Sequence, residues 1–151
     1  VEPAAPLERV AELKQQTSKA RTIATGNNPG GLESHYNAVN DHGQRFKTVC
    51  PSALIDIIAS DPEHRGMLLE LLENDRADLF LFDGAMPIPF GILDDIVFFG
   101  VENGQGSPLA LIETTDRHVR QWAEIQFRTI LDDATQLTRE RFEQDWLQQE
   151  Q

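Results

Sequence analysis

The amino-acid sequence predicts an α/β fold of the mixed (α+β) kind, in which one mixed sheet carries helices on its faces. In the first half of the chain, helical segments separate the strand-like segments, which implies crossover connections and some parallel pairing. From residue 79 onward the strand-like segments follow one another closely, which favours antiparallel pairing. With 151 residues, the chain has the size of one ordinary domain with a substantial hydrophobic core.

The first half of the chain is expected to alternate helices and strands. Leu7, Val10 and Leu13 recur at helical spacing between charged residues, which predicts a narrowly amphipathic helix over residues 7–20. Strand-forming residues and breaking glycines mark the segments that follow. These are a strand at 21–25, a loop at 26–31, a helix at 32–41, a strand at 44–50, a helix that opens at Pro51–Ser52, and a helix that restarts at Ser60–Glu63 and carries the apolar stripe Met67–Leu72.

The second half of the chain is expected to form four strands and two helices. Asp94 and Asp95 separate two apolar runs and predict a two-residue hairpin turn, although the Gly that usually favours such a turn is missing. Thr115 and Asp116 are capping residues ahead of an apolar stripe at helical spacing, which predicts a long helix. The expected segments are strands at 79–82, 90–93, 96–101 and 108–113, the long helix as far as Leu131, and a last polar helix over 138–147.

The composition argues against several classes of function. The chain has 25 Asp and Glu residues against 13 Lys and Arg, so its net charge of -12 opposes binding of a nucleic-acid backbone by the surface as a whole. No dense cluster of Lys or Arg stands out along the sequence. The chain shows neither an apolar run of about 18 residues nor a signal peptide, so we expect a cytoplasmic protein without membrane contact. The single cysteine, Cys50, excludes an internal disulfide and a cysteine-rich zinc site, and we expect neither a metal nor a cofactor.

Six polar residues that stand at strand ends or beside loops are the candidate ligand-binding residues. The loop Gly26–Gly31 separates a strand from a helix, which is where ligands bind in open α/β sheets. It matches neither the dinucleotide fingerprint nor the P-loop, and a plain turn that uses Gly and Asn for left-handed conformations explains it more simply. The six candidates are Asn27, Asn28, Ser34, His35, Ser52 and Asp94.

A hydrolase that uses Asp83, Asp94 or Cys50 is the weaker alternative. Cys50 ends a strand just before a helix, a position that can lower a thiol pKa, but no general base stands near it in the sequence. Asp94 and its neighbour Asp95 would point to opposite faces of an extended strand, so they do not form a catalytic pair by themselves. None of the four histidines has metalloprotease spacing or the His-x-Lys signature of phospholipases D. We therefore expect no catalytic residue and no enzymatic activity.

Three stretches of the second half resemble a family of archaeal regulators. They are Pro89–Val101, a strand, Asp-Asp and strand unit; Ser107–Asp116, an apolar strand that ends in Thr-Asp; and Val119–Phe127, a helix with Trp-Ala. This pattern is similar to the C-terminal sensor domains of TrmB-like and related phospholipase D-like transcription regulators, which are frequent in halophilic archaea. The first half of the chain is similar to them in topology only.

The resemblance implies a phospholipase D-like sandwich that senses an effector, dimerises and lacks catalysis. Residues 1–19 would be a linker or dimerisation helix, residues 20–135 the sensor domain, and residues 136–151 a C-terminal helix and tail. The implied partners are a second copy of the chain and a small polar effector. DNA would be contacted only by a winged helix-turn-helix module upstream of Val1. A protein-interaction module without a ligand is the alternative function.

The acid-rich, lysine-poor composition predicts that salt stabilises the fold. Only three lysines, at 14, 19 and 47, stand among the basic residues, and carboxylates that repel one another are screened by dissolved ions. We expect the thermal unfolding midpoint to rise steadily as KCl is increased from low to molar concentration, as measured by circular dichroism. Full stability in low-salt buffer would show that the acidity is that of an ordinary acidic domain.

Overall fold

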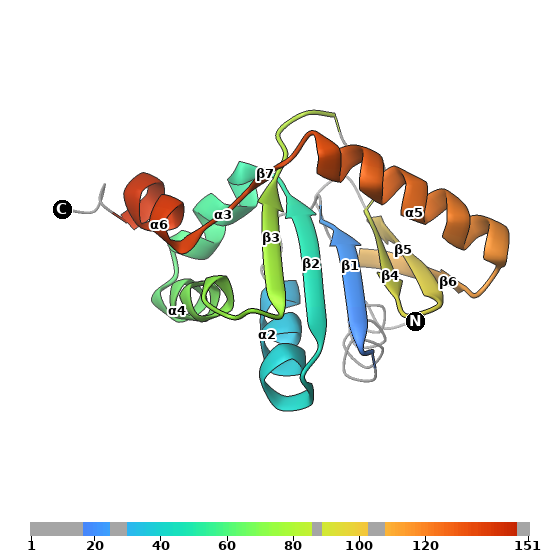
Figure 1. The fold of residues 1–151 in the computed structure, drawn as a ribbon, viewed down its shortest axis with the longest axis horizontal. Coiled ribbons are helices and arrows are strands. Elements are labelled where there is room, and N and C mark those ends of the chain that lie inside the picture. The colour runs from blue at the N-terminus through green and yellow to red at the C-terminus, as the bar shows by residue number, and fades with distance from the viewer. Residues whose placement is uncertain (1–16, 25–29, 86–88, 103–107, 148–151) are drawn as a thin grey trace.

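The computed structural model describes residues 17–24, 30–85, 89–102 and 108–147 (Figure 1). The predicted N-terminal helix lies outside the described residues except for its last four positions. Of these four, Lys19 and Ala20 belong to the first strand and not to a helix, so the expected helix end at residue 20 is wrong. The backbone hydrogen bonds of this strand to its two neighbours determine its actual start.

The described strands form one seven-stranded mixed sheet in the order β6-β5-β4-β1-β2-β3-β7. Three adjacent strands, β1, β2 and β3, run parallel, whereas β4, β5 and β6 form an antiparallel meander that joins the sheet beside β1. This arrangement confirms the mixed sheet predicted from the order of elements. The strands are β1 (Lys19–Ile23), β2 (Arg45–Cys50), β3 (Ala77–Leu81), β4 (Phe90–Leu93), β5 (Ile96–Glu102), β6 (Pro108–Thr114) and β7 (Thr135–Gln136).

Strand β7 was not predicted from the sequence. It pairs antiparallel with β3 over two residues only, and the Leu137 N–H donates to the Leu79 carbonyl at 2.8 Å just beyond it. Two residues are too short to show the period-two alternation by which a strand is recognised in a sequence. The strand therefore exists because the neighbouring edge of β3 is available, not because of its own composition.

Two of the longer helices begin where the sequence places capping residues. Asp61 accepts a hydrogen bond from the Glu63 N–H at 3.4 Å, and Asp116 accepts from the His118 and Val119 N–H groups at 2.8 and 3.1 Å. Such caps satisfy N–H groups that have no partner inside the helix. The predicted last helix divides into a short α-helix and a π-helical turn. The elements are α2 (Gly30–His42), α3 (Ser52–Ala59), α4 (Pro62–Leu72), α5 (Arg117–Asp132), α6 (Arg139–Phe142) and η1 (Glu143–Leu147).

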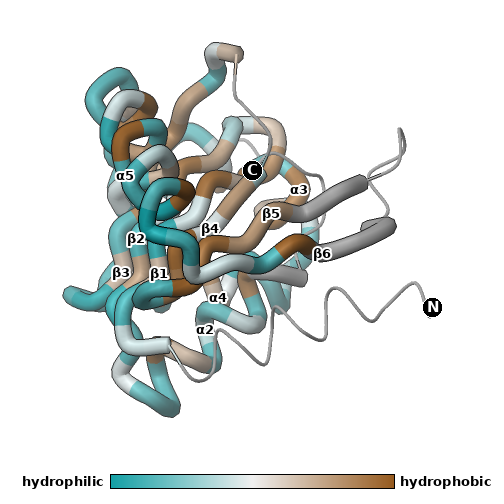
Figure 2. Tube along the Cα trace, turned by 90° about the vertical axis from the view of Figure 1, so that its right-hand side faces the viewer, coloured by the Kyte–Doolittle hydropathy of each residue, from teal (hydrophilic) through white to brown (hydrophobic). Residues whose placement is uncertain are grey.

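Helices cover the two faces of the sheet unequally, because alternate side chains of a strand point to opposite faces. One face packs Ala20, Phe46 and Leu79 against α2, α3, α4 and α6. The other face packs Ile23 and Val49, among others, against α5, which is the one helix in the described part of the chain that contributes to this second core. Figure 2 shows the apolar colour concentrated in the strands between these layers. In Figure 1, α5 runs past the upper part of the sheet, so it leaves the lower, N-terminal ends of β1, β2 and β3 uncovered on its side.

Aromatic packing fixes the meander strands to each other and to α5. Phe90, Phe99 and Trp122 lie with ring centroids 5.8–6.2 Å apart in tilted arrangements, which is the favourable range for aromatic pairs. On the opposite face of β4, the ring of Phe98 lies directly over Gly91, its cross-strand partner. A Cβ atom at Gly91 would collide with this ring.

We expect Gly91→Ala to destabilise the protein by about 1–3 kcal/mol, because the half-buried ring of Phe98 must shift to admit the methyl group. Gly66 in α4 is the matched control, since a Cβ atom added to it would have no atom within 4 Å. Gly66→Ala should stabilise the helix by roughly 0.5–1 kcal/mol. Urea unfolding would measure both, and equal effects of the two substitutions would contradict this packing.

Candidate functional site

The structure does not bring the four described candidate residues, Ser34, His35, Ser52 and Asp94, into one pocket. Asn27 and Asn28 lie outside the described residues. Ser52 follows the carboxyl end of β2, whereas Asp94 is hydrogen-bonded at the amino end of β1. The strands between these ends place the two residues roughly 15 Å or more apart. Ser34 is half-buried on α2 beside His35, which is buried.

His35 takes part in a buried polar arrangement and faces the sheet. Its ring stacks on Phe46 with centroids 3.8 Å apart, and its Nδ1 lies 3.4 Å from Oε1 of Gln44. Gln44 in turn donates through Nε2 to the Thr17 carbonyl at 3.0 Å. Buried polar groups need such partners, because burial without a hydrogen bond costs free energy. These contacts give His35 a structural role between α2 and β2.

Asp94 forms the turn of the β4–β5 hairpin and ties it to the start of β1. It adopts a left-handed backbone with φ 54°, which Asp tolerates better than most residues. Its carboxylate accepts from the backbone N–H groups of Ser18 at 3.1 Å and Lys19 at 3.0 Å. Both carboxylate oxygens are therefore engaged by the backbone.

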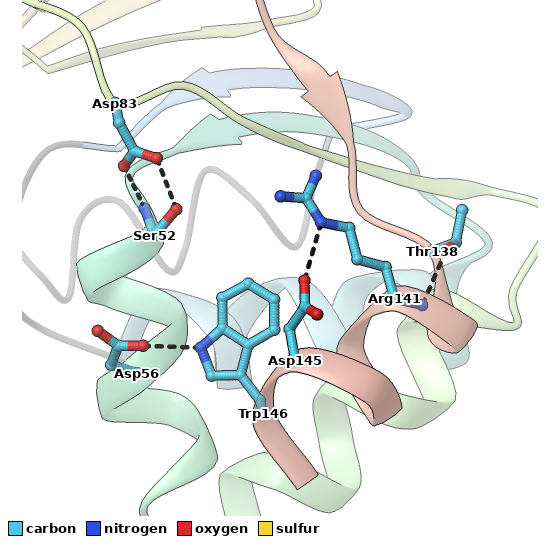
Figure 3. A network of polar contacts seen from close by, with 7 residues as sticks. All are labelled: Ser52, Asp56, Asp83, Thr138, Arg141, Asp145 and Trp146. Carbon is cyan, nitrogen blue, oxygen red and sulfur yellow. Dashed lines mark hydrogen bonds and ion pairs between the residues drawn. The ribbon is translucent and has the colours of Figure 1, made fainter. Parts of the chain in front are cut away.

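Ser52 and Asp83 form a local pair at the start of α3 (Figure 3). The Asp83 carboxylate accepts from the Ser52 hydroxyl at 2.7 Å and from the Ser52 backbone N–H at 2.8 Å. These two hydrogen bonds hold the pKa of Asp83 below its usual value, with a smaller contribution from the charge of Arg141. Pro51, at the N-cap position, makes no side-chain cap hydrogen bond. Asp83 thus supplies from the loop after β3 the acceptor that the helix start lacks.

The C-terminal turn docks beside this pair, as Figure 3 shows. The Trp146 indole N–H donates to Asp56 on α3 at 2.7 Å, and the Arg141 Nε donates to Asp145 at 3.3 Å.

The Cys50 thiol, at the end of β2, is buried, and burial raises its pKa to about 12, with the charge of Asp83 as a lesser cause. A thiol with that pKa is protonated at neutral pH and is a poor nucleophile.

A groove lies between α5 and the N-terminal ends of β1, β2 and β3. We call it the basic groove. Its volume is about 420 Å³, which lies within the range of small-molecule sites. Its charged lining residues are Lys19, Arg21, Arg45, Lys47, Arg76 and Arg128, together with Asp75, Asp78 and Glu124. Its apolar wall includes Phe127 and Leu131 of α5.

Strand register is what concentrates the cations. Lys19 is the cross-strand neighbour of Arg45, and Arg21 is the neighbour of Lys47. Alternation sends these four side chains to the face that α5 leaves open. No cluster of Lys and Arg dense enough to propose a basic patch stands out along the sequence, and the fold brings these cations together in three dimensions. The signal that could have revealed the cluster is a basic-apolar-basic triplet at residues 19–21 and again at residues 45–47.

Arg21 lies at the junction of the strands and α5. Its Nη2 donates to Oε1 of Glu124 at 2.9 Å, and this hydrogen bond lowers the pKa of Glu124 below its usual value. Its Nε is buried and has no hydrogen-bond partner in the described part of the chain. An unpaired buried donor is costly, so an acceptor that reached this nitrogen would be favoured.

Two other features of the described residues bear on the type of site. No group of three or more His, Cys, Asp or Glu side chains among them is arranged to hold a metal ion. None of the described helices combines the length and the apolar character needed to span a bilayer.

Comparison with known protein families shows to which family the chain belongs. The model of the family described as "Methanogenesis regulatory protein FilR1, middle domain" matches residues 3–133. The chain belongs to this family. Among curated proteins, no sequence matches significantly. The FilR1 middle-domain assignment supports the expected relationship to regulators, and it rests on most of the described domain.

Solved structures confirm the phospholipase D-like fold of this FilR1 middle-domain member. TrmBL2, an archaeal chromatin protein whose structure shows a novel mode of DNA binding, has a TM-score of 0.69 at 15% identity. NucT from Helicobacter pylori has a TM-score of 0.67 at 13% identity, over 90% of this chain and 93% of NucT. Nuc from Salmonella typhimurium, a phospholipase D family member, has a TM-score of 0.64 at 12% identity, over 87% of this chain and 90% of Nuc. The match to TrmBL2 covers 89% of this chain but only 52% of TrmBL2, so the chain spans about half of that protein.

The capping role of Asp83 can be tested by mutation. We expect Asp83→Ala to cost about 0.5–1 kcal/mol, at the low end of the range for helix caps because the carboxylate is exposed. Ser52→Ala should cost less, since the backbone N–H bond to Asp83 persists. Asp95→Ala, at an exposed turn position, controls for the lost charge.

The same role predicts a pH dependence. The folded pKa of Asp83 is depressed relative to the unfolded value of about 3.9, so its stabilisation is complete above that pH and is lost as pH falls through the folded pKa. The stability difference between the wild type and Asp83→Ala should shrink accordingly in urea unfolding at decreasing pH. A loss equal to that of Asp95→Ala at every pH would exclude the capping role.

Proposed function

We propose that the chain is the effector-sensing and dimerisation domain of a DNA-binding transcription regulator of the TrmB-like kind. The observation that carries the proposal is its membership of a family that is defined on the middle domain of a regulatory protein. A middle domain can connect a ligand to the parts of a regulator on either side of it. The similarity to TrmBL2, an archaeal chromatin protein that binds DNA, agrees with such a setting.

The basic groove offers a place where an effector could act. Its walls come from two separate units, the strands β1–β3 and the helix α5, and the Arg21–Glu124 ion pair joins them. A ligand that contacts both walls binds more tightly when α5 lies in one position against the sheet. Such a ligand therefore shifts the population toward that arrangement, which is how binding at one site can influence another.

The regulator would use this domain in an assembly. Its partners would be a second copy of the chain, a small effector, and DNA contacted through a helix-turn-helix module elsewhere in the longer protein. Trp122 and Ile125 on α5 are 41% and 59% exposed, and Ile112 on the edge strand β6 is 55% exposed. We propose that these side chains contribute to the contact with the second copy.

Two other functions are less well supported. A hydrolase that combined Asp83 with Asp94 would need them together, whereas their carboxylates are bound to backbone N–H groups at opposite ends of the sheet. A protein-interaction module without a ligand would not need the groove. We therefore retain a non-catalytic, ligand-responsive role.

The proposal predicts that some small molecule stabilises the chain. Thermal unfolding would be followed with a panel of neutral, cationic and anionic metabolites at constant ionic strength. A ligand at a hundredfold excess over its Kd should stabilise by about 2.7 kcal/mol, or roughly 5–10 °C for a domain of this size. For the full-length protein, the same ligand should change the affinity for its promoter DNA, as measured by fluorescence anisotropy. A flat response to every class would favour the interaction module.

A further inference from the structure

The basic groove differs sharply in charge from the rest of the molecule. It is lined by six cationic and three anionic side chains, a formal charge of +3, whereas the whole chain carries -12. Only two of the three lysines are in the described part of the chain, Lys19 and Lys47, and both line the groove. Both described lysines thus lie beside the four arginines of the groove, although lysine is rare in this chain.

This density has an energetic cost in the empty protein. The pairs Lys19–Arg45 and Arg21–Lys47 are like charges on neighbouring strands, and such pairs are destabilising. Among the described residues, no carboxylate forms an ion pair with Lys19, Arg45 or Lys47. Asp78 is the register neighbour of Lys47 on the other side, yet these two do not form an ion pair either. Among the described residues, carboxylates therefore offset this repulsion only in part, since Glu124 pairs with Arg21 whereas Lys19, Arg45 and Lys47 form no ion pair.

We propose, on the basis of the proposed sensing function, that the basic groove binds a small organic anion that carries more than one negative charge together with hydroxyl groups. The multiple charge would offset the cations of β1 and β2. Arg21, held by Glu124, presents a guanidinium whose planar fork suits phosphate and carboxylate oxygens. Its buried and unpartnered Nε indicates that the local acceptor count is one short.

The three carboxylates favour a small ligand with hydroxyl groups over a nucleic-acid backbone. Asp75, Asp78 and Glu124 stand among the cations, where they can accept hydrogen bonds from ligand hydroxyls. A DNA duplex carries about one negative charge per 1.7 Å and would meet these carboxylates repeatedly. The volume of about 420 Å³ and the apolar wall of Phe127 and Leu131 also match a compact molecule with a carbon skeleton.

The test uses four probes on the purified chain at constant ionic strength: glucose 6-phosphate, citrate, glucose, and a short DNA duplex. Binding would be measured by isothermal titration calorimetry and located by NMR shifts of β1 and β2 amides. We expect glucose 6-phosphate or citrate to bind, and the preferred one distinguishes a phosphate from a carboxylate source. Arg45→Gln and Lys47→Gln should each weaken that binding by about tenfold. Arg117→Gln, an exposed position on α5 outside the groove, removes the same charge as Arg45→Gln and should leave affinity unchanged.

A second readout separates a binding role from a structural one. Without ligand, Arg45→Gln should unfold at the same temperature as Arg117→Gln or higher, since it removes a like-charge pair. Equal weakening by Arg117→Gln, or no binding of either anion, would overturn the proposal. Binding of glucose alone would overturn it while leaving the sensing function intact, and groove-dependent binding of DNA would replace the small anion with a nucleic acid.

Discussion

The groove and both hydrophobic cores depend on one constraint, the in-register alternation of side chains on the three parallel strands β1, β2 and β3. One set of alternate residues is buried and largely apolar, because helices cover that face along its whole length. Its two polar members, Thr22 and Thr48, are hydrogen-bonded to each other at 2.8 Å. The other set changes along the strands from Arg21 and Lys47 to Ile23 and Val49. The change occurs where α5 begins to cover the face, so a single register produces an apolar contact at one end and a charged recess at the other.

The position of α5 determines the depth of this recess. Its N-terminal half is held over the meander by the aromatic contacts of Trp122 with Phe90 and Phe99. Its C-terminal half therefore passes across the parallel strands, where Phe127 contributes both to the core and to the groove wall. Beside Phe127, the Arg21–Glu124 ion pair adds a polar contact between β1 and α5. Because packing and charge meet on the same helix, a ligand in the groove would act directly on an element of the core.

Local pattern predicted most of the fold but little of the site. Helices and strands follow from periodicity and caps, which are properties of neighbouring residues, and Asp116 caps α5 as expected. The groove depends on register between segments about 26 residues apart, and neither basic triplet is unusual by itself. Asp83 acts on Ser52 from 31 residues away, so its capping role is not visible in sequence. His35 was a candidate because it is polar near a loop, but it is buried against Phe46.

The negative charge of the rest of the chain should make the groove select small anions over long polyanions. A long polyanion that approaches the groove must also approach the carboxylates around it, and this repulsion extends over about a Debye length, roughly 8 Å at physiological salt. A small anion fits within that distance of the cations and avoids most of the surrounding charge. Discrimination of this kind rests on repulsion of the wrong partner as much as on attraction of the right one. A chain with 25 acidic and 13 basic residues can therefore hold an anion site, provided that the ligand is small.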